Sequence, residues 1–504
     1  MFTSPLPAIQ IPEITLPELV LAHAARLGDK AALIDGASGS VLTYAALADR
    51  VDQVAASLAT RGLRHGDVVG LLAQNQPEYA AAFVGIARLG AIVTPIPSLA
   101  TVDEIARQLR DSGARLLVTD AGFLDRGEAA ASEAGLMGCV RIVDLATSPA
   151  AFRGAAASPH DVVALPFSSG TTGLPKGVEL THRNLVANVL QIGAQLEVGE
   201  DEVLIGALPF FHIYGLTVVL SLALSRGATI VTMPRWDLDA FLDLVERHRV
   251  TRAMLVPPIL LALARDPRVA GRDLSSLRIV KSGAAPLDAA LARAAAERIG
   301  AVVVQGYGMT EASPVTHVTA DRDGMRDPGS IGPLVPNTEA RLVDVSSGTD
   351  VGPGEAGELW VRGPQVMRGY LNDPAATAAT VDADGWLHTG DVARADEAGW
   401  FTIVDRVKEL IKVRGHAVAP AELEALLIGH PAVVDAAVVG MPDDEAGERP
   451  HAFVTLRTPV GADELRDWVA GRVAPYKRLA AVVVVDVIPR SASGKVLRRE
   501  LRAR

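Results

Sequence analysis

The chain has few of the features that mark secreted or membrane proteins. It contains one cysteine, Cys139, so no intramolecular disulfide can form, which fits a reducing compartment. No uninterrupted apolar stretch reaches the roughly 18 residues that a membrane-spanning helix needs. The N-terminus lacks the basic and apolar regions of a secretory signal, and the C-terminus is not a peroxisomal address. We therefore expect a cytoplasmic protein.

The chain also lacks an excess of positive charge. Its formal net charge is −11, which argues against nucleic-acid binding through a broad basic surface. A small polyanion would have to be bound by local basic sites. With 49% hydrophobic residues and 504 residues in all, the chain has enough apolar mass for several cores and about two to four domains.

The apolar pattern predicts an α/β fold. Predicted helices over 43–62, 78–89 and 102–112 alternate with short apolar runs at 68–72, 91–96 and 115–119, which is typical of α/β layers with mostly parallel sheets. The same alternation continues through 200–310. Past about 328, frequent Gly and Pro and short strands indicate a smaller β-rich subdomain.

A third region begins near residue 405. Pro420 opens a predicted helix, another helix is expected over 462–473, and apolar runs at 436–440, 452–456 and 481–487 read as strands. We therefore predict a large N-terminal domain of layered α/β subdomains plus a β-rich subdomain, over 1–404. A small, mobile α+β C-terminal domain over 409–504 is expected to follow a hinge at 405–408.

The most informative segment is Ser168-Ser-Gly-Thr-Thr-Gly-Leu-Pro-Lys-Gly177, which follows the strand-like run 162–167. Gly170 and Gly173 let the backbone wrap around a polyanion, and hydroxyls and a lysine supply donors and positive charge to phosphate oxygens. The spacing is not that of a Walker A loop. The segment predicts a phosphate-binding loop whose residues are Ser168, Ser169, Gly170, Thr171, Thr172, Gly173 and Lys176.

Five further strings accompany this loop in a fixed order. They are Ala207-Leu-Pro-Phe-Phe-His-Ile-Tyr-Gly-Leu216, Gln305-Gly-Tyr-Gly-Met-Thr-Glu311, Thr389-Gly-Asp391 with Asp405-Arg406, Arg406-Val-Lys-Glu-Leu-Ile-Lys-Val-Arg-Gly415, and Pro489-Arg-Ser-Ala-Ser-Gly-Lys495. Together they resemble the adenylate-forming superfamily of acyl-CoA synthetases, firefly luciferases and peptide-synthetase adenylation domains. Within it the chain is most similar to bacterial 4-coumarate–CoA ligases, over essentially its whole length.

The resemblance implies an acid–thiol ligase that uses ATP, Mg²⁺ and coenzyme A. It implies that Glu311 holds the magnesium, that Thr310 reaches the phosphate, that Tyr307 lies against adenine, and that His212 gates the acid pocket. A carboxylate suits Mg²⁺, which bridges phosphate oxygens. The remaining residues that the resemblance assigns to ATP or AMP are Gln305, Gly306, Gly308, Met309, Asp391 and Arg406.

Two successive reactions at one adenylate need different surroundings. The acid first attacks the α-phosphorus of ATP, and the thiol of CoA then attacks the acyl-adenylate. The resemblance implies that the small domain rotates about Lys408, presenting Lys495 for adenylation and Lys412 for thioester formation. One departure concerns Ala417, where plant ligases carry Gln. Its alanine cannot donate the hydrogen bond that the amide would supply, although His416 could substitute.

The residues that match the hydroxycinnamate pocket of plant ligases are Ile213, Tyr214, Thr217, Met254, Lys281, Gly283, Ala284, Gly306, Gly308, Pro314 and Val315. The small residues are expected to leave a slot for a flat ring, and Lys281 stands where plant ligases place a lysine near the 4-hydroxyl. The alternative for Lys281 is that it turns to solvent or pairs with a structural acid. Thr217 and Ser313 depart from the plant pattern, which has Asn and Gly there. We predict 4-coumarate or a related hydroxycinnamate as the substrate.

Several alternatives stay open at this stage. The acid could be a medium-chain fatty acid or another aryl acid, and the acceptor could be a carrier protein loaded in trans. A ligand-binding pseudoenzyme is disfavoured by the intact set of charged residues, and luciferase activity needs a specialised pocket and luciferin. The expected partners are small molecules rather than nucleic acid or membrane, and the expected state is a monomer or a weak homodimer.

Overall fold

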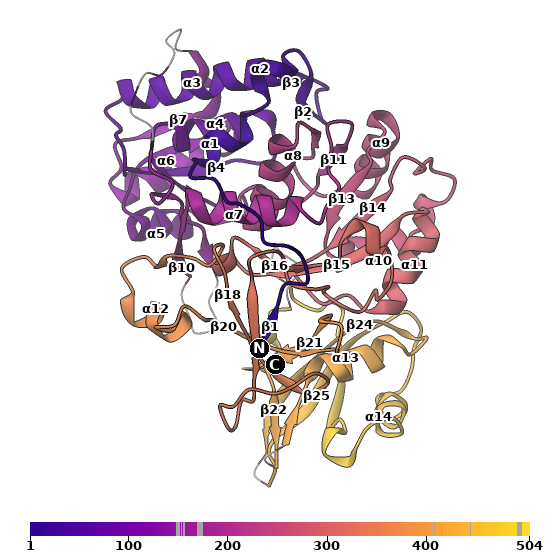
Figure 1. The fold of residues 1–504 in the computed structure, drawn as a ribbon. Coiled ribbons are helices and arrows are strands. Elements are labelled where there is room, and N and C mark those ends of the chain that lie inside the picture. Colours follow the sequence, from indigo (N-terminus) through magenta and orange to yellow (C-terminus); the bar gives the residue numbers. More distant parts are fainter. Residues whose placement is uncertain are drawn as a thin grey trace.

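The computed structural model describes residues 1–147, 152, 154, 157–168, 175–407, 409–414, 416–443, 445–490 and 496–503. In these residues the chain forms two α/β layers, an antiparallel sheet below them, and a small C-terminal unit (Figure 1). The predicted order of α/β, β-rich and α+β regions is confirmed. No helix in the described part of the chain is both long enough and apolar enough to cross a bilayer.

The first α/β layer is built on an eight-stranded sheet whose central strands are parallel. In spatial order the strands are β19 (Gly369–Tyr370), β10 (Lys176–Thr181), β8 (Val162–Ala164), β5 (Ile92–Pro95), β4 (Val68–Leu72), β6 (Ala114–Thr119) and β7 (Cys139–Arg141), with β9 (Phe167–Ser168) paired to β10. The strands at the β10 end run antiparallel. This end carries the predicted phosphate-binding string.

The helices of this layer begin and end where local signals place them. They are α3 (Tyr44–Thr60), α4 (Pro77–Arg88), α5 (Val102–Ser112) and α6 (Leu124–Ala134). Thr101 and Glu104 form a capping box at the start of α5, and Gly113 ends it with φ +67°. Helix α3 stops two residues before the predicted end, because Arg61 caps it and Gly62 turns away with φ +87°.

The second layer is another eight-stranded, mainly parallel sheet. Its order is β16 (Val315–Val318), β15 (Val302–Gly308), β14 (Ile279–Ser282), β13 (Arg252–Leu255), β11 (Val203–Gly206), β12 (Thr229–Thr232), β2 (Ala31–Asp35) and β3 (Val41–Thr43). Its helices include α9 (Leu238–His248), α10 (Pro257–Arg265) and α11 (Ala289–Ile299). The carboxyl ends of β13, β14 and β15 lead into the segments predicted to bind the acid and the nucleotide.

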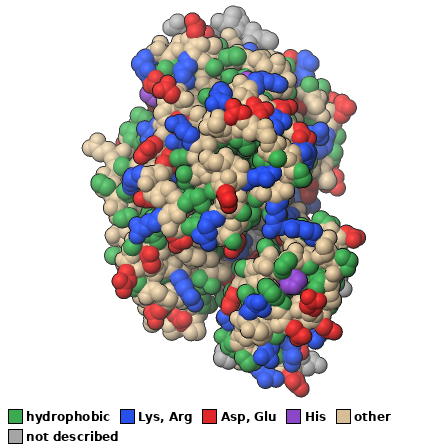
Figure 2. All heavy atoms as spheres, turned by 90° about the vertical axis from the view of Figure 1, so that its right-hand side faces the viewer, with side chains coloured by type: hydrophobic (Ala, Val, Ile, Leu, Met, Phe, Trp, Pro, Cys, Tyr) green, Lys and Arg blue, Asp and Glu red, His purple; other side chains and the backbone are tan. Residues whose placement is uncertain are grey.

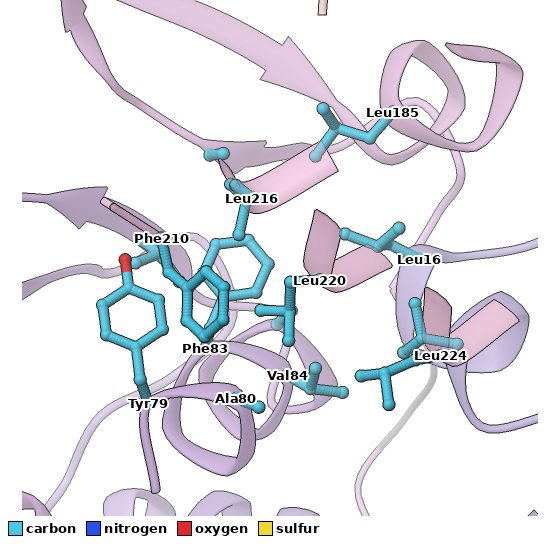
Figure 3. Close-up of a cluster of buried hydrophobic side chains, with 14 of the residues drawn as sticks. Leu16, Tyr79, Ala80, Phe83, Val84, Leu185, Phe210, Leu216, Leu220 and Leu224 are labelled. Carbon is cyan, nitrogen blue, oxygen red and sulfur yellow. The ribbon is translucent and has the colours of Figure 1, made fainter. Parts of the chain in front are cut away.

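The largest hydrophobic cluster joins the two layers. In Figure 3, Tyr79, Ala80, Phe83 and Val84 of α4 lie close to Phe210 and Leu220. Leu220 belongs to a π-helical segment, η3 (Tyr214–Ser221), which continues into α8 (Leu222–Ser225). The rings of Tyr79 and Phe210 are 5.8 Å apart. The short helices α1 (Leu16–Val20) and α2 (Ala24–Leu27) lie near the start of the chain, and Leu16 of α1 belongs to the same cluster.

Helix α7 (His182–Gly193) lies between the layers and carries buried amides (Figure 1). Asn184 donates to the carbonyls of Pro364 (2.9 Å) and Val366 (2.8 Å). Asn188 donates to Val315 O at 2.7 Å and accepts from Val315 N at 3.0 Å, and Gln191 donates to Pro336 O at 2.7 Å. Buried backbone groups need such partners, so α7 fixes three distant segments at once.

The β-rich region forms an antiparallel five-stranded sheet. Its order is β1 (Phe2–Thr3), β17 (Glu339–Val343), β18 (Ala356–Arg362), β20 (Leu387–Ala395) and β21 (Phe401–Arg406). Helix α12 (Pro374–Thr380) lies between β19 and β20 in the sequence. The N-terminal strand β1 thus closes a sheet whose other strands are more than 300 residues away, as the register of Phe2 with Ala340 shows.

The C-terminal unit has its own sheet and its own core. Strands β22 (Ile411–Val413), β23 (His416–Val418), β24 (Val433–Asp443), β25 (Gly447–Leu456) and β26 (Ala481–Val484) pair together, and α13 (Pro420–Ile428), α14 (Ala462–Ala470) and α15 (Arg498–Arg502) accompany them. Helix α14 ends three residues before the predicted end, with Gly471 as its cap. A hydrogen bond links β21 to this unit, because the carboxylate of Asp405 accepts from Ala421 N at 3.2 Å.

The surface in Figure 2 shows acidic and basic side chains mixed over the visible face, without one large patch of a single sign. The same view shows the small unit below the large one, with an indentation between them.

Candidate functional site

The predicted phosphate-binding string lies where β9 passes to β10. Ser168 at the end of β9 stands opposite Lys176 at the start of β10 in an antiparallel pair. Ser169, Gly170, Thr171, Thr172 and Gly173 lie outside the described residues. The two described ends of the string therefore lie side by side, as a loop that folds over a ligand requires.

Ser168 and Tyr370 both donate to the same oxygen of Glu311. Glu311 lies in the short 3-10 turn η5 (Thr310–Ala312), is buried, and accepts at Oε1 from Ser168 Oγ and from Tyr370 Oη, each at 2.9 Å. Tyr370 is placed by β19, which pairs with β10 so that Tyr370 faces Val178. Three neighbouring segments thus meet at one carboxylate.

Lys176 lies beside this carboxylate cluster. Its ammonium is 3.2 Å from Asp373 Oδ2 and 5.2 Å from the centre of the Tyr370 ring. The other oxygen of Asp373 accepts from Ala376 N at 2.9 Å and caps α12. The hydrogen bond from the Ala376 backbone N–H and, next, the hydrogen bond from Lys176 lower the pKa of Asp373. Asp373 therefore stays ionised and neutralises the lysine.

Glu311 fits a magnesium ion that is bound mainly through a nucleotide. In the described part of the chain no cluster of three or more His, Cys, Asp and Glu could hold a metal by itself. Mg²⁺ is commonly held by one or two carboxylates together with substrate phosphates. Glu311 is a buried carboxylate next to the predicted phosphate loop, and that donor set matches this pattern.

A second polar cluster joins Tyr307, Asp391 and Arg406. Asp391 of β20 and Arg406 of β21 are register partners, and Arg406 Nε lies 2.9 Å from Asp391 Oδ1. Tyr307 of β15 donates to Asp391 Oδ2. Burial, and next the charge of Asp391, raise the pKa of Tyr307, so its hydroxyl keeps its proton. The structure thus brings together three residues that the sequence assigned to the nucleoside.

The segment 305–310, which runs from the end of β15 into η5, is held by hydrogen bonds within the protein. The Gln305 side chain donates to Leu287 O (3.0 Å) and Pro328 O (2.7 Å) and accepts from Leu287 N, so its amide braces the protein and is not available to a nucleotide. Met309 N donates to Pro314 O at 2.9 Å. Thr310 opens η5 one residue before Glu311. The Gln305 carbonyl also accepts from Thr319 N at 3.1 Å, so the predicted nucleotide-binding role of Gln305 stays a prediction.

The aromatic-gate segment is fixed by a buried asparagine that the sequence did not single out. Asn75 donates to Gly206 O (2.8 Å) and Leu208 O (2.7 Å) and accepts from Phe210 N (2.7 Å). His212 follows this segment and accepts at Nδ1 from Tyr214 N at 3.2 Å. Ile213 and Thr217 are buried beside it, and Thr217 Oγ1 has no hydrogen-bond partner among the described residues.

Lys281 adopts the alternative in which it pairs with a structural acid. Its ammonium lies 3.0 Å from Asp321 Oδ1 and donates to Thr319 O, and both charged side chains are almost fully buried. Asp321 also pairs with Arg252, which in turn lies 3.1 Å from Glu202. Burial lowers the pKa of Lys281, and the charge of Asp321 opposes that effect. The lysine thus belongs to a buried ion network.

The small residues of the predicted pocket do not leave an open slot on the side where a Cβ would project. A Cβ at Gly283 would meet the Tyr214 ring at 2.9 Å, and one at Gly308 would meet Pro314 O at 2.1 Å. At Gly306 it would meet His317 O at 3.2 Å. These glycines let neighbouring segments of the chain pack closely against one another. Of the other pocket residues, Ala284 has φ +68°, Met254 and Val315 are buried, and Pro314 adjoins Val315.

Of the three lysines predicted for the hinge and the small unit, the structure describes Lys412. Lys412 lies on β22 with an exposed side chain, and its backbone N–H donates to Glu448 Oε2 at 2.8 Å. No described contact joins Lys412 to the Glu311 or Asp391 clusters. Lys408 and Lys495 lie outside the described residues. Their predicted roles stay predictions, as does that of Lys412.

Comparison with known proteins identifies the family of the chain. The AMP-binding enzyme family model matches residues 20–371, and the AMP-binding enzyme C-terminal domain model matches residues 422–495. A relative from Oryza sativa subsp. japonica, 4-coumarate–CoA ligase 3, is 45% identical, with 100% of this chain and 95% of the relative aligned.

Two solved structures extend the likeness to the whole fold. The anthranilate CoA ligase AuaEII in complex with anthranoyl-AMP superposes with a TM-score of 0.90 at 28% identity, covering 98% of both chains. O-succinylbenzoate coenzyme A synthetase (MenE) from Bacillus subtilis, in complex with ATP and magnesium ion, gives a TM-score of 0.85 at 32% identity, covering 96% of this chain and 99% of that one. The chain belongs to the AMP-binding enzyme family.

Proposed function

We propose that this chain is a 4-coumarate–CoA ligase that first forms 4-coumaroyl-AMP from ATP and then transfers the acyl group to coenzyme A. The single observation that carries the proposal is the 45% identity to a rice 4-coumarate–CoA ligase over the full chain. The clusters around Glu311 and Asp391 support it, because a buried carboxylate suits a metal and a carboxylate–arginine pair suits a ribose.

The first half-reaction brings two anions together. The carboxylate of the acid must approach the α-phosphate of ATP, so cations and donors are needed to offset their repulsion. Lys176 and Ser168, with the loop between them, are proposed to bind the phosphates, and Lys495 is proposed to join them. Glu311 would hold Mg²⁺, which neutralises phosphate charge. Asp391 and Arg406 are proposed to bind the ribose, and Tyr307 to lie beside the base.

The second half-reaction needs the thiol of CoA at the acyl carbonyl. We propose that the unit over 409–504 rotates about 405–408 relative to the domain over 1–404, and that Lys412 then faces the adenylate. The exposed side chain of Lys412 leaves it free to do so. The Ala417 position offers no amide donor, so any help from a side chain there has to come from a neighbour. We also propose that the enzyme acts in the cytoplasm as a monomer or weak homodimer.

The acid pocket is proposed to lie between η3 and the carboxyl ends of β13, β14 and β15. Tyr214 donates to Lys281 O at 3.2 Å and thus joins the two sides. Thr217 is a buried hydroxyl with no partner among the described residues, and it suits an acid with a polar substituent. A medium-chain fatty acid would leave that hydroxyl unpaired, which favours a hydroxylated aromatic acid.

The test is pyrophosphate release by the purified protein with ATP, Mg²⁺ and one acid at a time, with and without CoA. Mass detection identifies the CoA ester, and competition kinetics compare 4-coumarate, cinnamate and octanoate. We expect 4-coumarate to give the highest kcat/KM and a 4-coumaroyl-CoA product. A preference for octanoate would refute the substrate. Release without CoA-ester formation would refute the acceptor.

A further inference from the structure

Tyr370 links two groups that the proposed function assigns to different tasks. Its hydroxyl donates to Glu311 Oε1, and its ring lies under the ammonium of Lys176. Its strand, β19, is paired with β10, the strand that begins at Lys176. Neither Tyr370 nor Asp373 belongs to the motifs from which the nucleotide site was predicted. Both come from the segment between β18 and α12.

The two hydroxyl donors leave the carboxylate of Glu311 in a defined orientation. Ser168 and Tyr370 both bond Oε1. Within the described residues, Oε2 accepts no hydrogen bond. A tyrosine phenol keeps its proton at neutral pH, so Tyr370 serves as a donor to Glu311. A carboxylate held by one oxygen presents the other to a cation, and such outer partners commonly fix the geometry of a ligand.

Asp373 and the Tyr370 ring hold Lys176. The Lys176 ammonium contacts one oxygen of Asp373 at 3.2 Å, while the other oxygen caps α12. The lysine side chain is 30% exposed and that of Asp373 is 39% exposed, so the pair can be separated at low cost. A nucleotide phosphate carries more charge than one carboxylate and can replace it as the partner of Lys176.

We propose that Tyr370 is a positioning residue that orients Glu311 toward the metal of Mg·ATP and holds Lys176 beside it. We propose further that Asp373 is the counter-ion of Lys176 until nucleotide phosphates replace it. Both statements rest on the proposed function, because they take the site to bind ATP. They assign the segment 369–373 an indirect part in nucleotide binding, through Glu311 and Lys176, in addition to its strand and its helix cap.

The first test compares Tyr370→Phe with Tyr370→Leu. Phe keeps the ring below Lys176 and removes the donor to Glu311, whereas Leu removes both. Isothermal titration calorimetry measures binding of a non-hydrolysable ATP analogue with Mg²⁺ and, separately, with a chelator. We expect Tyr370→Phe to weaken binding about tenfold with Mg²⁺, the loss of one charge-assisted hydrogen bond, and to leave binding in chelator unchanged. Tyr370→Leu should weaken binding in both conditions.

The matched control is Tyr44→Phe, which removes a buried phenol that donates to Ala228 O, just before β12, at 2.6 Å. It should change neither affinity. If Tyr370→Phe lowers affinity equally with and without Mg²⁺, or not at all, the link from Tyr370 to the metal carboxylate is refuted. A wild-type protein that binds no analogue in either condition would instead contradict the proposed function itself.

The second test uses Asp373→Asn, which removes the charge and keeps a residue that caps helices well. Lys176 then has no ion pair to break before it binds a phosphate. We therefore expect the ATP analogue, measured in the presence of a chelator, to bind several-fold more tightly. Asp288→Asn is the control, since Asp288 caps α11 by accepting from Ala290 N and Leu291 N. Unchanged or weaker binding by Asp373→Asn, with the control unaltered, would overturn the counter-ion role.

Discussion

Asp391 and Arg406 face each other across neighbouring strands, with Arg406 Nε 2.9 Å from Asp391 Oδ1. Tyr307 donates to the other carboxylate oxygen from a different sheet. The side chain of Asp391 is 7% exposed, so its charge is compensated where water is largely excluded. This arrangement ties the β-rich sheet to the second α/β layer at the proposed ribose position.

Asp391→Asn should weaken AMP binding by about tenfold or more, because an amide offers one acceptor where the carboxylate serves two donors and a ribose. Calorimetric titration with AMP measures this. Asp273→Asn is the control, since Asp273 forms an ion pair with Arg249 in which both side chains are more than half exposed. It should leave AMP affinity unchanged. Equal affinities for both variants would remove Asp391 from the nucleotide site.

Lys281→Met should lower the free energy of unfolding by about 3 kcal/mol, because it breaks a buried ion pair and leaves Asp321 with Arg252 and the Glu197 N–H as its partners. Denaturant titration measures the loss. Since the ammonium already contacts Asp321 and Thr319 O, we expect the ratio of kcat/KM for 4-coumarate over cinnamate to change little. A collapse of that ratio would show that Lys281 recognises the 4-hydroxyl after all.

Lys495→Ala should abolish formation of the acyl-adenylate and leave thioester formation from supplied acyl-AMP largely intact. Lys412→Ala should do the reverse. The reason is the proposed rotation, which brings opposite ends of the small unit to one adenylate. Separate assays of the two half-reactions measure the effects. Equal losses in both half-reactions for both variants would contradict the rotation.

Because His182 is buried, we expect the stability of the fold to depend on pH. It is buried at the start of α7 and accepts at Nδ1 from Leu16 N at 3.1 Å. Burial lowers its pKa from 6.5 to about 4, although Asp161 and Glu18 oppose the effect. Between these values the unfolded chain binds the proton and the folded chain does not, so unfolding free energy rises with pH. The stabilisation is complete above pH 6.5 and is lost as the pH falls toward 4.

His182→Asn keeps an acceptor near Nδ1 and cannot take up a proton. Wild type should therefore lose up to about 3 kcal/mol more than the variant between pH 6.5 and 4. Urea titrations across this range provide the measurement, and the comparison at pH 7.5 shows the cost of the substitution itself. Parallel stability curves for the two proteins would refute the role of His182.

Asn75→Ala should destabilise the fold by about 3 kcal/mol, since it leaves the buried Leu208 O and Phe210 N without a partner and Gly206 O with Met233 N alone. Because these groups position the segment that leads to His212, the KM for the acid should rise more than the KM for ATP. Thermal melts and steady-state kinetics give both quantities. A loss of stability with equal changes in the two KM values would leave Asn75 a purely structural role.

Helices whose first and last residues are set by local sequence signals could be predicted well. Helix α5 begins and ends at the predicted residues, because its capping box and its left-handed Gly113 are both visible in the sequence. The partners of a side chain depend on strands far apart in the chain. Lys281 meets Asp321 only because β14 and the residues after β16 lie together. The sequence around Gly308 likewise does not reveal that Pro314 O fills the space beside this glycine.

The buried amides of α7 bear on how the large domain can be divided. They hold backbone groups at 315, 336, 364 and 366, which all lie more than 120 residues further along the chain. A truncated fragment that ends near residue 310 would lose all these partners and would expose the side of α7 that they cover. We therefore expect such a fragment to be much less stable than the full domain. During synthesis, α7 stays incompletely packed until the segment up to residue 366 has been made.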